Sequence, residues 1–480
     1  MRIDEYVTLD AVELASLVKV GDITPRELAQ LARRACEQVN PALNALVEFY
    51  EDAETVAGAD AGHFQGVPFL RKDIGPAEAN RLQEKGSRLF QGHRPVADGF
   101  FFQQARKVGL RTVGRTAISE LAMSGATETL LHGITRNPWN PDLTAGGSSG
   151  GAAAAVAAGI VPIAHASDGG GSIRGPASWC GLVGLLPSRG RISSDGNEDQ
   201  RGGRSRDFVL CRSVRDMAAA LDAFSGYHAG DAFVIVKPER PYIDELDRPT
   251  GPLKIGVARR TWGHLPVEPE VVQAVDDVAK LLEGMGHQLT GIPAPFDFEE
   301  FLGLALSEAG TYMLWLENVA KEMGRRLDLD GLEPINLRYY EYGQRELAAS
   351  PNALATLARQ DATIRRIRRQ VAAATGAFDV LLTPTQPFVA HPHGVHSLLD
   401  AESSAEEWTA QGYKGCHLPI FNVTGQPAVS LPLATSSSGM PIGVQLVAHF
   451  GDEATLVRIA RDLEEALPWN GRRPPVLATG

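Results

Sequence analysis

Three consecutive glycines, Gly169 to Gly171, precede Ser172 in the stretch AHASDGGGSIRGPAS. Because glycine has no Cβ atom, such a backbone can curl until several N–H groups point at one place, which is how an oxyanion is stabilised during acyl transfer. A serine beside these donors is suited to attack a carbonyl carbon. The stretch therefore predicts a nucleophile at Ser172 and an oxyanion hole at Gly169, Gly170 and Gly171. An equally good alternative is a plain glycine turn between a strand, VPIAHAS, and a short helix.

Two further serines, Ser148 and Ser149, stand where a glycine-rich turn passes into an alanine-rich segment, AGGSSGGAAAAVAAG. Alanine has the best helix propensity and a minimal side chain, so we expect a closely packed, buried helix that begins at these serines. In the simplest interpretation the serines cap that helix. The pattern also matches a G-x-S-x-G nucleophile elbow centred on Ser148, which needs a strand running into the turn and a histidine as base. The preceding segment, TRNPWNPDLTAGG, contains two prolines and predicts a loop instead.

A serine nucleophile needs a proton acceptor, and Lys72 is a candidate. It follows an apolar run in GVPFLRKDIG, which would carry its ammonium group into a desolvated site where the neutral amine is accessible. The alternative is an ordinary solvated lysine. Lys72 becomes a convincing base only if the fold brings it to the serines.

The elements that must position these residues are a mixture of strands and helices. TPRE, at 24–27, has the form of a capping box and predicts a helix near the N-terminus. LKIGVA at 253–258, the apolar periodicity at 271–282 and GHQLTGI at 286–292 predict a β-α-β unit. AVSLPLA, PIGVQLVA and a closing helix near 456–467 supply further elements, so the sheet is expected to draw on both ends of the chain. Residues 1–480 are predicted to form a single α/β domain.

Composition excludes several classes of function. The net charge of −12 opposes binding to nucleic acid or to an anionic membrane, and no charge-free apolar span of about 18 residues is present. Four widely spaced cysteines, without a CxxC pair, favour a reducing cytoplasm over disulfides or zinc. The sequence AHPHGVHS gathers three histidines, His391, His393 and His396, but no carboxylate pattern accompanies them, so we expect neither a metal nor a cofactor.

Taken in order, GVPFLRKD, GATETLLHGITRNPWNPDLTAGGSSGG and ASDGGGSIRGPASWCGLVGLLPSRGRIS resemble the amidase signature family, as does FNVTGQPAVSLPLATSSSGMPIGVQLVA near the C-terminus. The resemblance implies a mixed, largely parallel sheet between helices and a Ser-cisSer-Lys catalytic triad. In this triad Lys72 is the base, Ser148 is a bridging serine preceded by a cis peptide bond, and Ser172 is the nucleophile. It also places Ala122, Ser124, Gly125 and Ser149 near the substrate, although a turn before a strand explains the first three as well. Asp168 and Arg174 are expected to support the loop.

The same resemblance implies an amidohydrolase that acts through an acyl-enzyme on small linear or cyclic amides, anilides and carbamates. SVRDMAAALDAFSG and LEEALPWNGRRP are similar to hydrolases of aminohexanoate cyclic dimers (nylon oligomers), and related members include aryl acylamidases and urethanases. The expected partners are substrate and water alone, in a cytoplasmic monomer or homodimer. The alternative is the glutaminase subunit of a tRNA-dependent amidotransferase. Gly175 stands where an aliphatic residue is usual, which predicts a roomier acyl pocket. Specificity is expected from Tyr312, Met313, Trp315 and Leu316 as an apolar wall, unless they belong to an ordinary core helix.

Overall fold

The structure is a computed structural model that describes residues 1–193, 202–350, 352–412 and 417–479. Among these residues, eleven strands form one sheet. Across the sheet they are β1 Leu46–Phe49, β3 Arg111–Thr116, β2 Pro68–Lys72, β8 Ile163–Asp168, β10 Arg206–Cys211, β9 Val183–Leu186, β14 Ala428–Thr435, β15 Pro441–Ala448, β13 Val380–Pro384, β11 Lys254–Val257 and β12 Gln288–Gly291. The sheet therefore draws on both ends of the chain, as expected.

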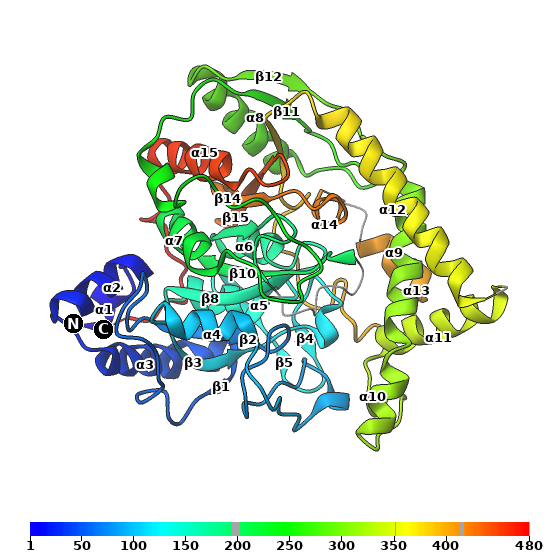
Figure 1. The fold of residues 1–480 in the computed structure, drawn as a ribbon, viewed down its shortest axis with the longest axis horizontal. Helices are drawn as coiled ribbons and strands as arrows, with labels where there is room; N and C mark the ends of the chain where they lie inside the picture. The colour runs from blue at the N-terminus through cyan, green and yellow to red at the C-terminus, as the bar shows by residue number, and fades with distance from the viewer. Residues whose placement is uncertain (194–201, 351, 413–416, 480) are drawn as a thin grey trace.

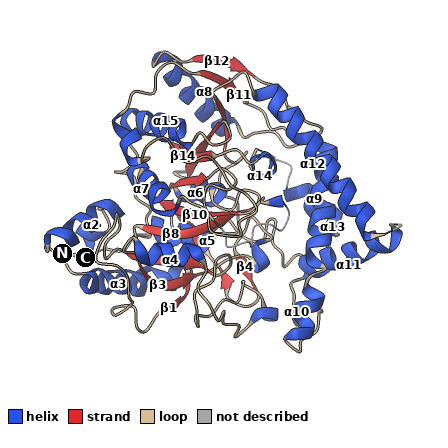
Figure 2. Ribbon diagram, viewed as in Figure 1, coloured by secondary structure: helices blue, strands red, loops and turns tan. Residues whose placement is uncertain are grey.

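The sheet is mixed and flanked by helices (Figures 1 and 2), which confirms the predicted fold class. Parallel pairing is confined to two blocks, β3–β2–β8 and β13–β11–β12. The strands between these blocks pair antiparallel with their neighbours, and so does β1 with β3. Parallel pairing thus accounts for a smaller share of the sheet than the resemblance implied, because the hairpin β14–β15 and its neighbours occupy the centre.

The helices expected from the sequence are present. A capping box of Thr24 and Glu27 begins α3 (Pro25–Leu43), and the β-α-β unit is β11, α8 (Pro269–Gly284) and β12. The closing helix is α15 (Glu453–Ala466). The other helices are α1 Ile3–Tyr6, α2 Ala11–Val20, α4 Phe100–Lys107, α5 Gly150–Ala157, α6 Arg174–Cys180, α7 Val214–Phe224, α9 Phe298–Met313, α10 Leu316–Glu322, α11 Pro334–Ala349, α12 Ala353–Thr375, α13 Ala405–Gly412 and α14 Pro419–Thr424.

Helix α5 is the alanine-rich segment, and every one of its residues is buried. Small side chains let it lie directly against backbone: a Cβ atom on Gly151 would come within 2.5 Å of the backbone nitrogen of Ala117. Its partner α6 packs on it and on β9, β14 and β15. Helix α5, which begins two residues after Ser148, is therefore held in place by its packing in the centre of the core.

Helices α9, α10, α11 and α13, called here the helical layer, lie beside the sheet (Figure 1). α9 packs against α11, α12 and α13. A Cβ atom on Gly343 of α11 would come within 2.3 Å of the carbonyl oxygen of Gly310 in α9, so this crossing requires glycine. Within the described residues no helix is both long and apolar enough to cross a bilayer.

Candidate active site

Neighbouring elements bring the three predicted catalytic residues to one region. Lys72 is the last residue of β2, and β8, its parallel neighbour, ends four residues before Ser172. Parallel neighbours end at the same edge of a sheet, so the residues that follow them meet there. Ser148 precedes α5, which packs against β2 and β8. The peptide bond between Gly147 and Ser148 is cis, as the resemblance predicted.

Lys72 is completely buried, and among the described residues its amine makes hydrogen bonds to oxygen atoms alone. The Nζ atom donates to Ser148 Oγ at 2.7 Å and to Ser167 Oγ and the Ser167 carbonyl oxygen at 3.0 and 3.2 Å. Burial lowers the pKa of Lys72 to about 7, and the carboxylates of Asp207 and Asp168 oppose that shift. A substantial fraction of Lys72 is therefore neutral near neutral pH, as a proton acceptor must be.

Ser148 and Ser149 have different roles in the structure. Ser148 is completely buried and accepts from Lys72. Ser149 occupies the N-cap position of α5, but its side chain makes no capping hydrogen bond and donates instead to the carbonyl oxygen of Ser167 at 3.3 Å. Ser149 is also completely buried. This hydrogen bond ties the turn before α5 to β8, and the contact of Ser149 with substrate stays a prediction.

The nucleophile-elbow interpretation is only partly matched. Residues Asn140–Thr144 form a strand, β7, which pairs with β6 (Arg136–Asn137), so the predicted loop before Ser148 is wrong at these positions. Both strands lie outside the main sheet. The partner of Ser148 is the amine of Lys72, and within the described residues no histidine makes a hydrogen bond with it. The elbow chemistry, which depends on histidine, finds no support.

Ser172 lies in the turn between β8 and α6 and is partly exposed. Within the described part of the chain its hydroxyl has no hydrogen-bond partner, so the link between Ser172 and Ser148 is not formed in this structure. Of the glycines before it, Gly169 is exposed and Gly170 is partly exposed. The N–H of Gly171 donates to Asp168 Oδ1 at 2.6 Å, so in this structure that donor is engaged within the turn. The oxyanion hole at these glycines stays a prediction.

Asp168 is the centre of the network that shapes this turn. Its carboxylate accepts from Arg174 Nε and Nη2, both at 3.0 Å, and from Asn422 Nδ2 at 2.9 Å. Arg174 reaches Gln445 Oε1 at 2.8 Å. Burial alone would raise the pKa of Asp168, but Arg174 and Asn422 outweigh it and hold the pKa far below its usual range. Asp168 and Arg174 thus support the loop, as expected.

The segment with Ala122, Ser124 and Gly125 lies against the turn before Ser148. A Cβ atom on Gly147 would come within 2.6 Å of the Ser124 carbonyl oxygen. Ser124 is buried and its hydroxyl donates to the His396 carbonyl oxygen at 2.9 Å, so that side chain stabilises a turn. Gly125 is exposed, and Ala122 is partly exposed with a left-handed φ of 59°. Of these residues, Gly125 and Ala122 remain available to line a substrate site.

The extra space that the sequence predicts at Gly175 is occupied by another side chain. A Cβ atom at Gly175 would lie 2.7 Å from Nε2 of Gln386, and one at Gly171 would lie 2.8 Å from Cβ of Leu418. The pocket is therefore not roomier at Gly175, because the Gln386 amide fills the place of a side chain. Gln386 follows β13, a strand far from Gly175 in sequence, so the glycine alone did not indicate it.

The predicted apolar wall is divided between the core and a half-buried surface. Met313 and Leu316 are completely buried within a cluster that includes Leu121 and Trp408, as the core-helix alternative expects. Tyr312 and Trp315 are half-buried. The Trp315 ring lies 5.8 Å from that of Phe90.

The three histidines of AHPHGVHS point to different partners. His393 Nδ1 lies 3.3 Å from Glu128 Oε1, the His391 ring packs edge-on against Trp179, and His396 stacks on Trp408. Across the ranges that the structure covers, no three metal-ligating side chains are grouped for an ion. Cys36, Cys180 and Cys211 are free and buried, and Cys416 lies outside the described residues.

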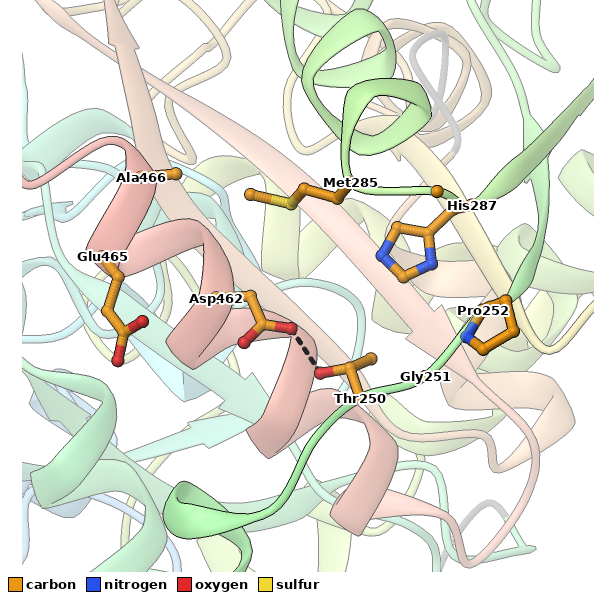
Figure 3. Close-up of a pocket in the computed structure, with 9 residues that line it drawn as sticks. Thr250, Gly251, Pro252, Met285, His287, Asp462, Glu465 and Ala466 are labelled. Atoms are coloured by element: carbon orange, nitrogen blue, oxygen red, sulfur yellow. Dashed lines mark hydrogen bonds between the residues drawn. The ribbon is translucent and has the colours of Figure 1, made fainter.

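A surface pocket lies elsewhere in the molecule (Figure 3). The side chain of Thr250 donates to Asp462 across it. It shares no residue with the candidate active site; its lining residues are Thr250, Gly251, Pro252, Met285, Gly286, His287, Asp462, Glu465 and Ala466.

Comparison with known proteins shows the family of this chain. The model of the Amidase family matches residues 27–457. The chain is 34% identical to a 6-aminohexanoate-cyclic-dimer hydrolase from Paenarthrobacter ureafaciens, over 98% of this chain and 97% of that protein. It is 32% identical to one subunit of the glutamyl-tRNA(Gln) amidotransferase from a Synechococcus strain, over 95% of this chain and 96% of that protein.

Solved structures show the same fold over nearly the whole chain. A 6-aminohexanoate cyclic dimer hydrolase in complex with substrate superposes with a TM-score of 0.89 at 32% identity, covering 98% of this chain and all of that one (100%). A bacterial aryl acylamidase superposes with a TM-score of 0.85 at 25% identity, covering 97% and 99% of the two chains. The chain therefore belongs to the amidase signature family. It is a hydrolase of amide C–N bonds.

Sequence reasoning missed several residues that surround Lys72 and the turn that contains Ser172: His165, Ser167, Asp207, Gln386, Asn422 and Gln445. His165 and Asp207 carried a weak signal, since each is a polar residue in a buried strand where apolar residues are expected. Asn422 and Gln445 come from distant segments, and only the fold brings them to Asp168 and Arg174.

Proposed function

We propose that this amidase hydrolyses small amides through Lys72, Ser148 and Ser172. The hydrogen bond of 2.7 Å between Lys72 Nζ and Ser148 Oγ carries this proposal. It joins a completely buried amine, whose pKa is lowered to about 7, to the hydroxyl of Ser148, near the turn that contains Ser172. An ordinary surface lysine would have neither property.

In the proposed reaction, neutral Lys72 takes the proton of Ser148, and Ser148 takes that of Ser172. The Oγ atom of Ser172 then forms a bond to the carbonyl carbon, and the carbonyl oxygen becomes an oxyanion. The bond between carbon and nitrogen breaks, and the proton returns through Ser148 to the departing amine. Water follows the same path to release the acid and to restore Ser172.

The second link of the relay has to form during this cycle. Because catalytic hydrogen bonds are often completed only when substrate binds, we propose that rotation of the Ser172 side chain brings its hydroxyl to Ser148. The N–H groups of Gly169, Gly170 and Ser172 make no hydrogen bond to another described residue, so they are the candidate oxyanion donors. The N–H of Gly171 is excluded by its bond to Asp168.

The proposed substrates are linear or cyclic amides of aminohexanoate type, anilides and aryl carbamates. Support comes from relatives named for a cyclic dimer and for aryl acylamides. The second candidate is a glutaminase that works within a larger enzyme, supported by the 32% identity to one subunit of a glutamyl-tRNA(Gln) amidotransferase. The two differ in their test, since the glutaminase would require glutamine and a partner with tRNA.

The decisive experiment measures hydrolysis of a nitroanilide, an aryl carbamate, the cyclic and linear aminohexanoate dimers, and glutamine by the purified protein. We expect turnover of at least one non-glutamine substrate without any partner, and an acyl group on the peptide that contains Ser172 in quenched samples. Glutamine hydrolysis that requires an added partner and tRNA, with no turnover of the other substrates, would favour the second candidate.

Variants of the serines separate catalysis from support. Ser172→Ala and Ser148→Ala are expected to lower kcat/KM by at least about 10³-fold, because each breaks the relay. Ser149→Ala is the matched control, since it removes a neighbouring buried hydroxyl whose hydrogen bond, within the described ranges, goes to Ser167; a loss of less than about tenfold is expected. Wild-type rates in Ser172→Ala would overturn the assignment.

A further inference from the structure

A buried histidine holds the backbone of Lys72, and the mechanism above does not use it. The N–H of Lys72 donates to His165 Nδ1 at 3.2 Å, and His165 Nε2 lies 3.0 Å from Asp207 Oδ1. Because a backbone N–H can only donate, Nδ1 must present its lone pair. Nε2 therefore carries the hydrogen and donates it to Asp207. The chain Lys72–His165–Asp207 crosses three adjacent strands, β2, β8 and β10.

The hydrogen-bonded series Lys72–His165–Asp207 is buried and closely packed. His165 is completely buried and Asp207 is 5% exposed. The rings of Phe101 and Phe102 lie 4.7 and 5.3 Å from the imidazole. Burial lowers the pKa of His165, which favours the neutral ring, although the bond to Asp207 opposes that shift.

The backbone after Lys72 is fitted closely to the same carboxylate. Gly75 adopts a left-handed φ of 91°, and a Cβ atom there would lie 2.7 Å from Asp207 Oδ1. The turn that leaves β2 therefore packs directly on Asp207. The N–H of Lys72 and the turn that follows Lys72 therefore both pack against the His165–Asp207 pair.

We propose that His165 and Asp207 are positioning residues for Lys72. His165 fixes the backbone from which the amine extends, and Asp207 fixes the imidazole while it places a negative charge near that amine. This inference rests on the proposed function, because it concerns the base of that reaction.

The charges around Lys72 make the role of Asp207 measurable. Burial lowers the pKa of Lys72, and the carboxylates that raise it are Asp207 and Asp168. Asp168 is paired with the Arg174 guanidinium, whereas the hydrogen bond of Asp207 goes to a neutral ring. Arg71 and Lys72 are the cations that act on His165. Removal of the Asp207 charge should therefore let the pKa of Lys72 fall further.

The first test is Asp207→Asn, which keeps an oxygen to accept from His165 and removes the charge. We expect the acid limb of the kcat/KM profile to move to lower pH by about 0.5–1 unit. The matched control is Asp222→Asn, where the carboxylate accepts from the N–H groups of Tyr242 and Ile243 and does not contact Lys72 or His165; its acid limb should stay in place. An acid limb that Asp207→Asn leaves unmoved would overturn the role of Asp207.

The second test separates the two nitrogens of His165. In His165→Asn the amide oxygen takes the place of Nδ1 and can still accept from Lys72, whereas in His165→Gln the amide takes the place of Nε2 and that acceptor is lost. Above the acid limb, we expect kcat of His165→Gln to be about tenfold below that of His165→Asn, with KM alike. Equal kcat values would contradict the proposal.

Different results would overturn the proposed reaction and the positioning role of His165 and Asp207. If Ser172→Ala retains activity, the proposed function falls. If Ser172→Ala is inactive while Asp207→Asn keeps the acid limb and the two His165 variants are alike, only the positioning role falls. Circular dichroism and urea unfolding identify any variant that does not fold, and the remaining variants then decide.

Discussion

A lysine can accept a proton only when it is uncharged, and the surroundings of Lys72 favour that form. Its amine donates to three serine oxygen atoms, and no carboxylate of the residues that the structure describes makes a hydrogen bond with it. Asp168 and Asp207 nevertheless act on it from a distance. Desolvation and two negative charges thus act on the pKa of Lys72 in opposite directions, and their balance sets the pH at which the amine becomes neutral.

This balance predicts the pH dependence of the reaction. Because the neutral amine is the active form and the pKa of Lys72 is about 7, kcat/KM should rise as pH increases through about 7 and then level off. The measurement is a pH profile from 5 to 9 with a nitroanilide whose own ionisation does not change. A profile that is flat, or that falls over this range, would argue against Lys72 as the base.

A second prediction at the scale of single residues concerns the contact between Gly175 and the side-chain amide of Gln386. Gly175→Ala places a methyl group 2.7 Å from Gln386 Nε2, so Gln386 must move and the site beside Ser172 is disturbed. We expect KM for an anilide to rise several-fold in Gly175→Ala. The double variant, Gly175→Ala with Gln386→Ala, should bring KM back toward the wild-type value, because the shorter side chain leaves room for the methyl group. Steady-state kinetics of the single and double variants test this coupling. Additive losses in the double variant would show that the two residues do not compete for space.

Among the elements, α9 and α11 of the helical layer cross closely at Gly310 and Gly343. Gly343→Leu must separate the two helices, since even a Cβ atom would lie 2.3 Å from the Gly310 carbonyl oxygen. We expect the free energy of unfolding to fall by about 1–3 kcal/mol. The control is Gly303→Ala on α9, where a Cβ atom meets nothing within 4 Å; a change of about 0.5–1 kcal/mol in the stabilising direction is expected. Urea unfolding compares the two variants, and equal losses would contradict the close crossing.

The sequence predicted helices and strands better than it predicted the contacts between distant segments. Capping residues, apolar periodicity and strand composition located α3, α8, α15, β14 and β15, because these signals are local. The prolines before Ser148 were misleading, since Pro141 lies within β7, a short strand outside the main sheet. The order of strands in the sheet depends on pairing between distant segments, so composition did not reveal its antiparallel centre.

The same distinction applies to the candidate site. Lys72, Ser148 and Ser172 were indicated by short motifs, and the structure brings the first two into contact. The inward orientation of Ser149 and the engaged N–H of Gly171 were not predictable, because each depends on where a neighbouring strand or carboxylate comes to lie. Gln386 had no local signal, since its importance arises only from the absence of a side chain at Gly175.

At the scale of the whole molecule, a buried carboxyl pair, Glu120 and Glu333, connects the helical layer to the segment 120–130, which precedes Ser148 in the chain. Glu120 accepts from the N–H of Glu333 at 2.9 Å and from Asn336 Nδ2 at 2.7 Å, both at the start of α11. Glu333 in turn accepts from the N–H of Leu130 at 3.0 Å. Burial, together with the charge of Glu120, raises the pKa of Glu333 to about 9.

This raised pKa predicts how stability depends on pH. The folded protein keeps a proton that the unfolded chain releases above about pH 4.3, so stability from this group is complete below that pH and is lost as pH rises toward 9. One such proton corresponds to about 1.4 kcal/mol per pH unit. Glu333→Gln, which mimics the protonated acid, should therefore gain stability relative to the wild type between pH 6 and pH 9.

Urea unfolding at several pH values measures that gain. Glu341→Gln, a change at an exposed position of the same helix, is the control and should keep the slope of the wild type. A difference between Glu333→Gln and the wild type that stays constant with pH would show that Glu333 is ionised in the folded protein.

The hydrogen bonds of Asp168 and Arg174 with Asn422 and Gln445 also have a consequence during synthesis on the ribosome. The residues that carry the proposed chemistry are all translated within the first 172 positions, yet the strand that completes the support of their turn, β15, ends at Ala448. A nascent chain therefore emerges with its reactive groups long before it can hold them in place. Hydrolytic activity should appear only when almost the entire polypeptide has left the exit tunnel.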